Sequence, residues 1–254
     1  FMTQQQWKAF CAFKKEFQDI CDLWKNKYSE ILKPLQKQIA NQDKVPEYPI
    51  ENPIVYNTAL DEVSQSDEIK LILIGDNPGK NEQLEINKKY LVGLSGKIAD
   101  NFFKKNIELQ TDFRKNVIIL NKTPIHTAKT KELLFLASQN KEIAELIKTS
   151  QIWMAKKTVE LQIALNCKMW LVGYAEVKEK GIFQEYKKTL FEEYQKNEDG
   201  KNAYKNFFVY QHFSMNRFLI DLNEFSSSKK STNKTLETKL NELGTIHKKQ
   251  IFGL

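Results

Sequence analysis

Four short apolar runs without polar alternation constrain the fold of this chain more than any other feature. Their sequences are IKLILIG, NVIILN, KMWLVG and NFFVYQH, and they begin near residues 69, 116, 168 and 206. Such runs are typical of strands buried on both faces, as in a parallel sheet covered by helices. The intervening segments have helical spacing and are long enough for crossovers. The sequence therefore predicts a three-layer α/β/α sandwich around a four-stranded parallel sheet, with right-handed connections.

The segments on either side of this predicted sheet differ from it in composition. Residues 1–45 carry apolar and aromatic side chains at three- and four-residue steps, which predicts one or two amphipathic helices. The proline-rich stretch VPEYPIENPIVYN then leads into an α/β domain that we assign to residues 46–225. Residues 226–254 begin with a polar, low-complexity stretch and hold six lysines and two glutamates. We expect a basic C-terminal tail there, either a loosely attached short helix or a partly disordered segment.

Composition excludes several classes of protein. The 254 residues contain no apolar run of 18 or more and no secretory signal at the start, so we expect a soluble, cytoplasmic protein with no membrane partner, and a monomer. Three cysteines without CxxC spacing argue against a disulfide framework, a zinc site or an iron–sulfur site. No HExxH or GxSxG motif occurs either. We therefore expect no metal and no cofactor.

The formal charge of +7 says little about nucleic acid by itself. Lysine and arginine number 39 and aspartate and glutamate 32, and residues 226–254 alone carry +4 of the excess. By subtraction, about +3 remains for the first 225 residues, which is a small excess for a nucleic-acid-binding domain.

Unusual polar residues follow each of the four apolar runs: GDNPG, NKTP, GYAE and QHFS. The carboxyl ends of parallel strands lie at one edge of a sheet, where ligands bind at a topological switch point. In GDNPG, Gly75 and Gly79 permit a tight turn, while Pro78 disfavours helical geometry at Asn77. One interpretation is a catalytic loop that presents Asp76 and Asn77; the other is an ordinary turn in which one of them caps the next helix.

Three further features lie near the same predicted edge. The stretch YLVGLSGKIADNFF, residues 90–103, places two glycines around Ser95 before an apolar helix, a pattern that can hold phosphate but matches no nucleotide-binding motif. Asn121 ends the second run and can either read the edge of a base or tie down its loop. His212 ends the fourth run and is either a site residue or a core histidine. We expect His126 to be incidental and His247 to lie at the surface.

In this order, the motifs GDNPGKNE, LVGLSG, ILNKTP, VGYAE and HFSMNR resemble the uracil-DNA glycosylase superfamily over roughly residues 69–220. The resemblance implies a divergent member without the iron–sulfur cysteines, acting in base excision DNA repair. It implies a DNA glycosylase that hydrolyses, without a metal, the N-glycosidic bond of uracil or a related deaminated or mismatched base flipped out of single- or double-stranded DNA.

The resemblance also implies roles for single residues. Asp76 or Asn77 would orient water, His212 would stabilise negative charge on the uracil O2, and Asn121 would bond the uracil edge. Other residues expected at the base are Gly75, Tyr90 and Leu91. Those expected to contact DNA are Pro78, Gly79, Gly93, Ser95, Ser214, Met215, Asn216 and Arg217, with the segment from Met215 to Phe218 as the wedge that fills the vacated stack.

Two departures from the superfamily pattern favour an alternative. Phe213 replaces the proline that usually follows the motif histidine, and Tyr90–Leu91 stand where the iron–sulfur branch carries a stacking phenylalanine before Val-Gly. The alternative function is a nucleic-acid-binding or interaction module on the same fold, without catalysis.

Overall fold

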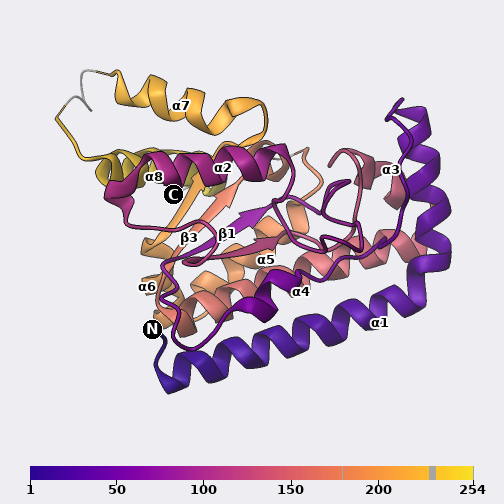
Figure 1. Cartoon of the computed structure of the whole chain (residues 1–254), viewed down its shortest axis with the longest axis horizontal. Helices are drawn as coiled ribbons and strands as arrows, with labels where there is room; N and C mark the ends of the chain where they lie inside the picture. Colours follow the sequence, from indigo (N-terminus) through magenta and orange to yellow (C-terminus); the bar gives the residue numbers. More distant parts are fainter. Residues whose placement is uncertain (179, 229–232, 254) are drawn as a thin grey trace.

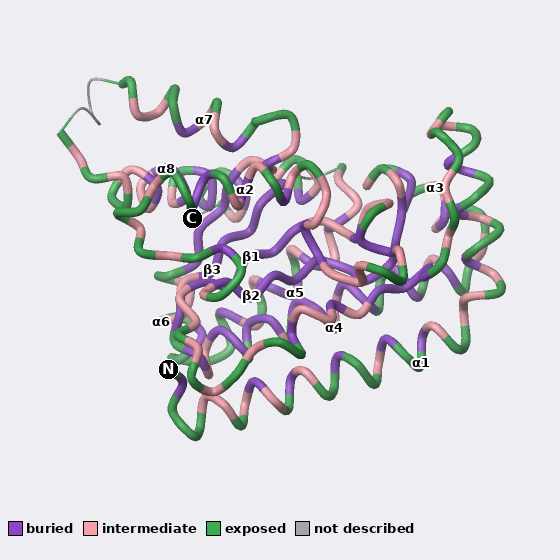
Figure 2. Tube along the Cα trace, viewed as in Figure 1, coloured by how far each residue is buried: buried purple, intermediate pink, exposed green. Residues whose placement is uncertain are grey.

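The computed structural model describes residues 1–178, 180–228 and 233–253. Its described residues form one sheet of four parallel strands in the order β2-β1-β3-β4. The bounds are Leu71–Gly75 for β1, Val117–Asn121 for β2, Lys168–Val172 for β3 and Phe207–Tyr210 for β4. Each strand falls within an apolar run, and nearly every strand residue is buried (Figure 2). The predicted parallel sheet is confirmed.

Helices cover both faces of this sheet, which confirms the predicted three-layer sandwich (Figure 1). Helices α2, α7 and α8 lie on one face; α4, α5 and α6 lie on the other, and α1 packs outside α4. The bounds are α1 Gln4–Gln42, α2 Leu94–Lys105, α3 Glu132–Gln139, α4 Lys141–Leu165, α5 Gln184–Gln195, α6 Glu198–Lys205, α7 Arg217–Ser226 and α8 Leu236–Phe252. Short 3-10 helices occupy Thr58–Glu62, Ile107–Leu109, Tyr174–Val177 and Ser214–Asn216.

The N-terminal segment forms a single helix of 39 residues. Thr3 and Gln6 cap its start reciprocally, because each side chain bonds the backbone N–H of the other residue. On its inner face, Phe17 stacks on Trp153 of α4 with ring centroids 5.7 Å apart, and Trp24 meets the same ring edge-on at 6.4 Å. Aromatic packing therefore joins residues 17–24 of α1 to α4.

The C-terminal segment contributes a helix that packs against β4. The Tyr210 hydroxyl on β4 donates to the Leu240 carbonyl at 2.8 Å, and the His247 ring bonds the Val209 carbonyl at 3.1 Å. His247 is only 5% exposed, so the expectation that it lies at the surface was wrong. Helix α8 is thus part of the core of the domain. The start of the predicted low-complexity stretch includes residues 229–232, which lie outside the described residues.

The substitution Gly244→Ala tests this packing, because a loose helix and a packed helix predict opposite changes in stability. A Cβ atom there would lie 2.7 Å from Phe208 Cβ and from the Tyr210 ring. Because alanine favours a helix over glycine by about 1 kcal/mol, Gly244→Ala would stabilise a loosely attached helix. We expect it instead to lower the free energy of unfolding by about 1–3 kcal/mol through overpacking, measured by urea denaturation. The exposed Gln250→Ala on the same helix is the control, with an expected change within about 0.5 kcal/mol. Stabilisation by Gly244→Ala would contradict the packing.

Candidate base-binding pocket

The loops that follow the strands enclose a small pocket at the carboxyl edge of the sheet. Its volume is about 170 Å³. The side chains and backbone that line it are Asp76, Asn77, Gly79, Glu82, Leu91, Ser95, Asn121, Thr127, Ala128, Thr130 and His212. Seven of these were expected at the site from the sequence; they come from the β1–α2 connection, the start of α2, the end of β2 and the segment after β4. The structure therefore brings the main candidate residues together.

Asp76 lies at the topological switch point of the sheet. The strand order places β2 on one side of β1 and β3 on the other, and Asp76 directly follows β1. Gly173, which follows β3, has a φ of 83°, and a Cβ there would lie 2.7 Å from Asp76 Oδ1. Glycine at 173 thus supplies both the left-handed backbone and the space that the carboxylate occupies.

A buried lysine holds this carboxylate. Lys122 has a fully buried side chain, and its Nζ donates to Asp76 Oδ1 at 2.6 Å, to the Gly75 carbonyl at 3.2 Å and to the Val172 carbonyl at 2.9 Å. Burial lowers the pKa of Lys122, and the charge of Asp76 opposes that shift. The lysine was not among the residues expected at the site. Its three acceptors show that it ties β1, β2 and β3 together.

Asn77 is oriented by its amide nitrogen. Nδ2 donates to the Ile125 carbonyl at 3.0 Å and to Thr127 Oγ1 at 2.8 Å, and that hydroxyl donates onward to the Lys129 carbonyl. Its Oδ1 is therefore left as an acceptor at the pocket. The helix-cap interpretation of Asp76 and Asn77 is wrong, because the next α-helix begins only at Leu94 and has Gly93 as its N-cap.

Asn121 presents an amide without a protein partner. The residue is 2% exposed, and its buried Nδ2 has no hydrogen-bond partner among the described residues. Gly75 permits this placement, since a Cβ there would lie 2.5 Å from Asn121 Oδ1. A buried unsatisfied amide costs about 1–3 kcal/mol, so such groups call for an explanation. At the wall of a pocket, the explanation that fits is a ligand that accepts this N–H.

His212 is held as a neutral hydrogen-bond donor. The Ser214 backbone N–H donates to His212 Nδ1 at 3.0 Å, and the Ser214 hydroxyl lies 2.8 Å from the same atom. Nδ1 must therefore be the unprotonated nitrogen, which puts the ring proton on Nε2. Burial lowers the pKa of His212, Asp76 opposes that shift and Lys122 adds to it. The pocket thus receives a neutral imidazole.

Glu82 joins two of the pocket loops and was missed from the sequence. Its carboxylate accepts the Gly79 N–H at 3.0 Å and the Leu91 N–H at 2.9 Å. Burial raises the pKa of Glu82 to about 7, against the backbone hydrogen bonds from Gly79, Leu91 and Val92 and the charge of Arg114. Its position in GDNPGKNE, three residues after Gly79, was the one available signal.

The Leu91 loop is shaped by close backbone contacts. Leu91 has a φ of 51°, and Arg114 donates to its carbonyl at 2.6 Å. A Cβ at Gly96 would lie 1.5 Å from the same carbonyl oxygen, so only glycine allows α2 to approach this loop.

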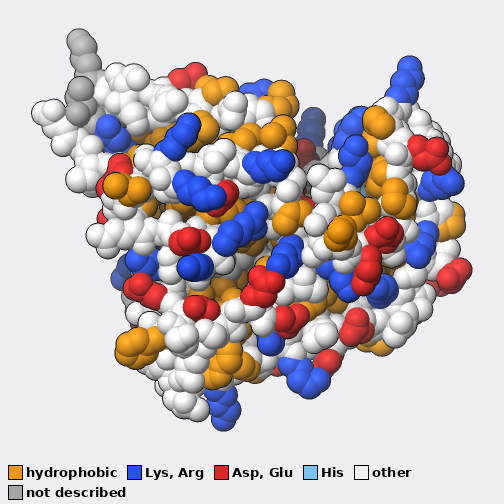
Figure 3. Space-filling model, in the orientation of Figure 1, with side chains coloured by type: hydrophobic (Ala, Val, Ile, Leu, Met, Phe, Trp, Pro, Cys, Tyr) orange, Lys and Arg blue, Asp and Glu red, His pale blue; other side chains and the backbone are white. Residues whose placement is uncertain are grey.

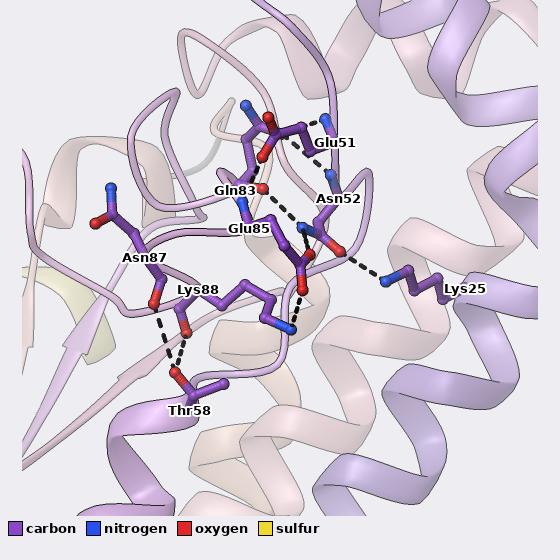
Figure 4. A network of polar contacts seen from close by, with 8 residues as sticks. All are labelled: Lys25, Glu51, Asn52, Thr58, Gln83, Glu85, Asn87 and Lys88. Carbon is purple, nitrogen blue, oxygen red and sulfur yellow. Dashed lines mark hydrogen bonds and ion pairs between the residues drawn. The ribbon is translucent and has the colours of Figure 1, made fainter.

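A polar network anchors the segment that carries Glu82 (Figure 4). Gln83 Oε1 accepts the backbone N–H groups of Glu51 and Asn52 at 2.7 and 3.1 Å, and Asn52 Nδ2 donates to the Gln83 carbonyl. Lys25 of α1 donates to Asn52 Oδ1 at 2.6 Å. The proline-rich connector therefore links the pocket loop to the N-terminal helix.

His126 is fully buried, and both of its ring nitrogens contact polar groups. One ring nitrogen contacts the Pro78 carbonyl at 2.9 Å and the other contacts the Tyr48 hydroxyl at 2.9 Å. Because the carbonyl can only accept, Nδ1 carries the proton. Burial lowers the pKa of His126 to about 4.

The other residues expected at the site do not line the pocket. Tyr90 is 1% exposed and donates its hydroxyl to the Val55 carbonyl at 2.6 Å, beneath the loop. Met215 is 75% exposed, whereas Phe218 is 2% exposed, so Met215 projects and Phe218 belongs to the core. The remaining ones are Gly75, Pro78, Gly93, Ser214, Asn216 and Arg217.

Two kinds of feature are absent from the part of the chain that the structure describes. Its residues contain no cluster of three or more His, Cys, Asp or Glu side chains that could hold a metal ion. Nor does any helix in those residues have the length and apolar character needed to cross a membrane.

The pair of Lys122 and Asp76 allows a double-mutant test. Lys122→Met leaves a largely buried carboxylate without its cation, so we expect the free energy of unfolding to fall by about 3–5 kcal/mol. Adding Asp76→Asn removes that charge and should restore at least about 1 kcal/mol. Urea denaturation of the two single variants and the double variant measures the coupling. Strictly additive losses would contradict a direct interaction.

Glu82 makes stability depend on pH. Its folded pKa of about 7 lies above the ordinary value of 4.5, so its contribution is complete below about pH 4.5 and is lost as the pH rises through 7. We expect the free energy of unfolding of the wild type, relative to Glu82→Gln, to fall by about 3 kcal/mol between pH 4.5 and pH 8. Urea denaturation at both pH values measures this difference. An unchanged difference would contradict the shifted pKa.

Comparisons with known proteins provide no family for this chain. No protein-family model matches it, and no similar protein was found among curated proteins or among solved structures. Its function is therefore inferred from the chemistry of the pocket and from the motifs that form it.

Proposed function

We propose that this protein is a DNA glycosylase of the uracil-DNA glycosylase type. It hydrolyses the N-glycosidic bond of uracil, or of a related deaminated or mismatched base, after that base has flipped out of DNA. The observation that carries the proposal is the unpartnered amide of Asn121, which shares one small pocket with the neutral His212 donor and the Asn77 acceptor.

The size of the pocket supports a single ring as its occupant. Its volume of about 170 Å³ is below the roughly 300 Å³ at which pockets for drug-sized ligands begin. A whole nucleotide would not fit, whereas a pyrimidine ring would, with its sugar and phosphates at the mouth. This is the arrangement required when an enzyme extracts one base from a stack.

The polar groups support a neutral base rather than an anion. The Asn121 amide donates to an acceptor on the base edge, and His212 Nε2–H donates to the carbonyl oxygen on which charge grows as the glycosidic bond breaks. A donor fixed before the reaction stabilises that developing charge without reorganisation. Since His212 is neutral, it offers this hydrogen bond without placing a full positive charge in the pocket.

Water is proposed to attack from the other side. Asn77 Oδ1, fixed by the two bonds of its amide nitrogen, accepts a hydrogen bond from a water molecule and directs its oxygen at C1′. The C1′–O bond forms as the C1′–N bond breaks, the water loses a proton, and the base leaves as an anion that takes up a proton. Asp76 stabilises the positive charge on the sugar, moderated by Lys122.

Contact with DNA is proposed to depend on a few residues near the pocket. On the face in Figure 3, lysine and arginine lie among aspartate and glutamate instead of forming one basic patch. Met215 projects from a backbone in the left-handed region, with a φ of 55°, beside Ser214 of the His212 loop. We propose Met215 as the wedge that occupies the space vacated by the base.

The ion pair at the switch point favours a second candidate, a nucleic-acid-binding module without catalysis. Lys122 neutralises Asp76, and a neutralised carboxylate stabilises a positive sugar less well. Phe213 stands where the superfamily that the motifs resemble carries proline; it stacks on Phe218 at 4.3 Å and so has a packing role of its own.

A cleavage assay distinguishes the two candidates. The protein is incubated with a single-uracil oligonucleotide, single- or double-stranded, and abasic sites are cleaved with alkali. We expect product with the wild type and with the control Gln250→Ala, and a rate lower by about 100-fold or more with Asn77→Ala and with His212→Ala.

Absence of product on uracil, hypoxanthine and mismatch substrates would overturn the glycosylase proposal. If product forms, an unchanged rate in His212→Ala would overturn the role of His212. Binding to the same oligonucleotides that weakens steeply with salt, without cleavage, would support the second candidate.

A further inference from the structure

A larger cavity lies at the opposite edge of the sheet from the proposed base pocket. Its volume is about 430 Å³, within the range of roughly 300–1,000 Å³ that is usual for small-molecule sites. It is formed where β1 and β3 begin and is partly closed by α8. Its lining residues are Glu68, Ile69, Lys70, Leu71, Phe103, Leu109, Thr111, Asn166, Cys167, Lys168, Trp170, Asn206, Glu237, Leu240 and Asn241.

The inner wall of this cavity is aromatic and apolar. Trp170 of β3 is 5% exposed and stacks on Phe103 of α2 with ring centroids 5.7 Å apart. Leu71 and Leu240 are also buried there. A wall of this kind favours a flat ring over a flexible or strongly hydrated molecule.

One donor in that wall has no acceptor. The indole Nε1–H of Trp170 is buried and has no hydrogen-bond partner within the described residues. Buried indole N–H groups normally have a hydrogen-bond acceptor, because a buried donor without one costs about 1–3 kcal/mol.

The mouth of the cavity offers neutral polar groups. Its two lysines are each paired with a glutamate, Lys70 with Glu68 at 3.4 Å and Lys168 with Glu237. By contrast, the side-chain amides of three asparagines make no hydrogen bond to any described residue; these are Asn166, Asn206 and Asn241. The paired lysines and glutamates leave little net charge at the mouth, and the asparagine amides can both donate and accept hydrogen bonds. These groups suit an uncharged ligand that also carries hydrogen-bond donors and acceptors.

We propose that this cavity binds a neutral, flat heteroaromatic molecule of one or two rings. An in-plane acceptor atom of the ligand takes the Trp170 N–H, its ring packs in the apolar wall beside Trp170 and Phe103, and its outer edge meets the asparagine amides. The site lies at the amino ends of the strands, so it is separate from the proposed base pocket. Its existence does not depend on the glycosylase activity.

Benzimidazole and indole form a matched pair of probes. They have nearly the same shape, but only benzimidazole carries a ring nitrogen that can accept the Trp170 N–H. Each is titrated into uniformly ¹⁵N-labelled full-length protein at mildly alkaline pH, where both are uncharged. The readout is the indole N–H signals of the four tryptophans in the NMR spectrum. Trp170→Phe identifies the signal of Trp170 by its loss.

We expect benzimidazole to shift the Trp170 signal saturably, and to bind at least about tenfold more tightly than indole. The variant Asn241→Phe fills the mouth and should abolish the shift, whereas Gln250→Phe, exposed on the same helix, should leave it unchanged. An unmoved Trp170 signal at the highest soluble benzimidazole concentration would overturn the proposal. So would equal binding of the two probes, or a shift that persists in Asn241→Phe.

Discussion

The candidate site is organised around one buried ammonium group. At the carboxyl ends of the parallel strands, the Lys122 ammonium donates to the carbonyl groups of Gly75 and Val172 and to the carboxylate of Asp76. Burying this charge is unfavourable unless every donor has a partner. The three acceptors satisfy that requirement and draw β1, β2 and β3 together at the point where the strand order reverses. The carboxylate then needs the space that Gly173 leaves.

This arrangement sets the electrostatics of the pocket. Because Lys122 balances Asp76, the other groups at the wall act mainly as neutral donors and acceptors. Asn77 offers an oxygen, Asn121 an amide N–H, and His212 an imidazole N–H whose proton position follows from the Ser214 backbone. Glu82 holds the Gly79 and Leu91 loops at a fixed separation. A wall of fixed neutral dipoles suits an uncharged ring better than a phosphate.

The sequence predicted the sheet well because uninterrupted apolar runs have few other solutions. It also predicted that Asp76, Asn77, Asn121 and His212 would share one edge, since parallel strands end together. The part that it did not predict depends on burial. A lysine directly after a strand is usually solvated, so Lys122 gave no signal that it would be enclosed. The pKa of Glu82 likewise depends on desolvation by loops that are distant in sequence.

The C-terminal helix shows a different cause of error. Its lysines suggested a surface segment, and His247 was placed there by association. Leu240, Gly244, His247 and Ile251 nevertheless recur at helical spacing, which puts them on one face, and that face packs against β4. The prediction gave the lysine content of the segment more weight than the helical spacing of its buried residues.

We propose that one small pocket binds a pyrimidine ring between Asn121 and His212. A crystal structure of the protein soaked with uracil tests this most directly. We expect uracil in the pocket, with Asn121 Nδ2 and His212 Nε2 each within hydrogen-bond distance of an acceptor on the ring, and with Asn77 Oδ1 on the side where C1′ would lie. A pocket that holds only water at saturating uracil, or uracil bound away from both side chains, would contradict it.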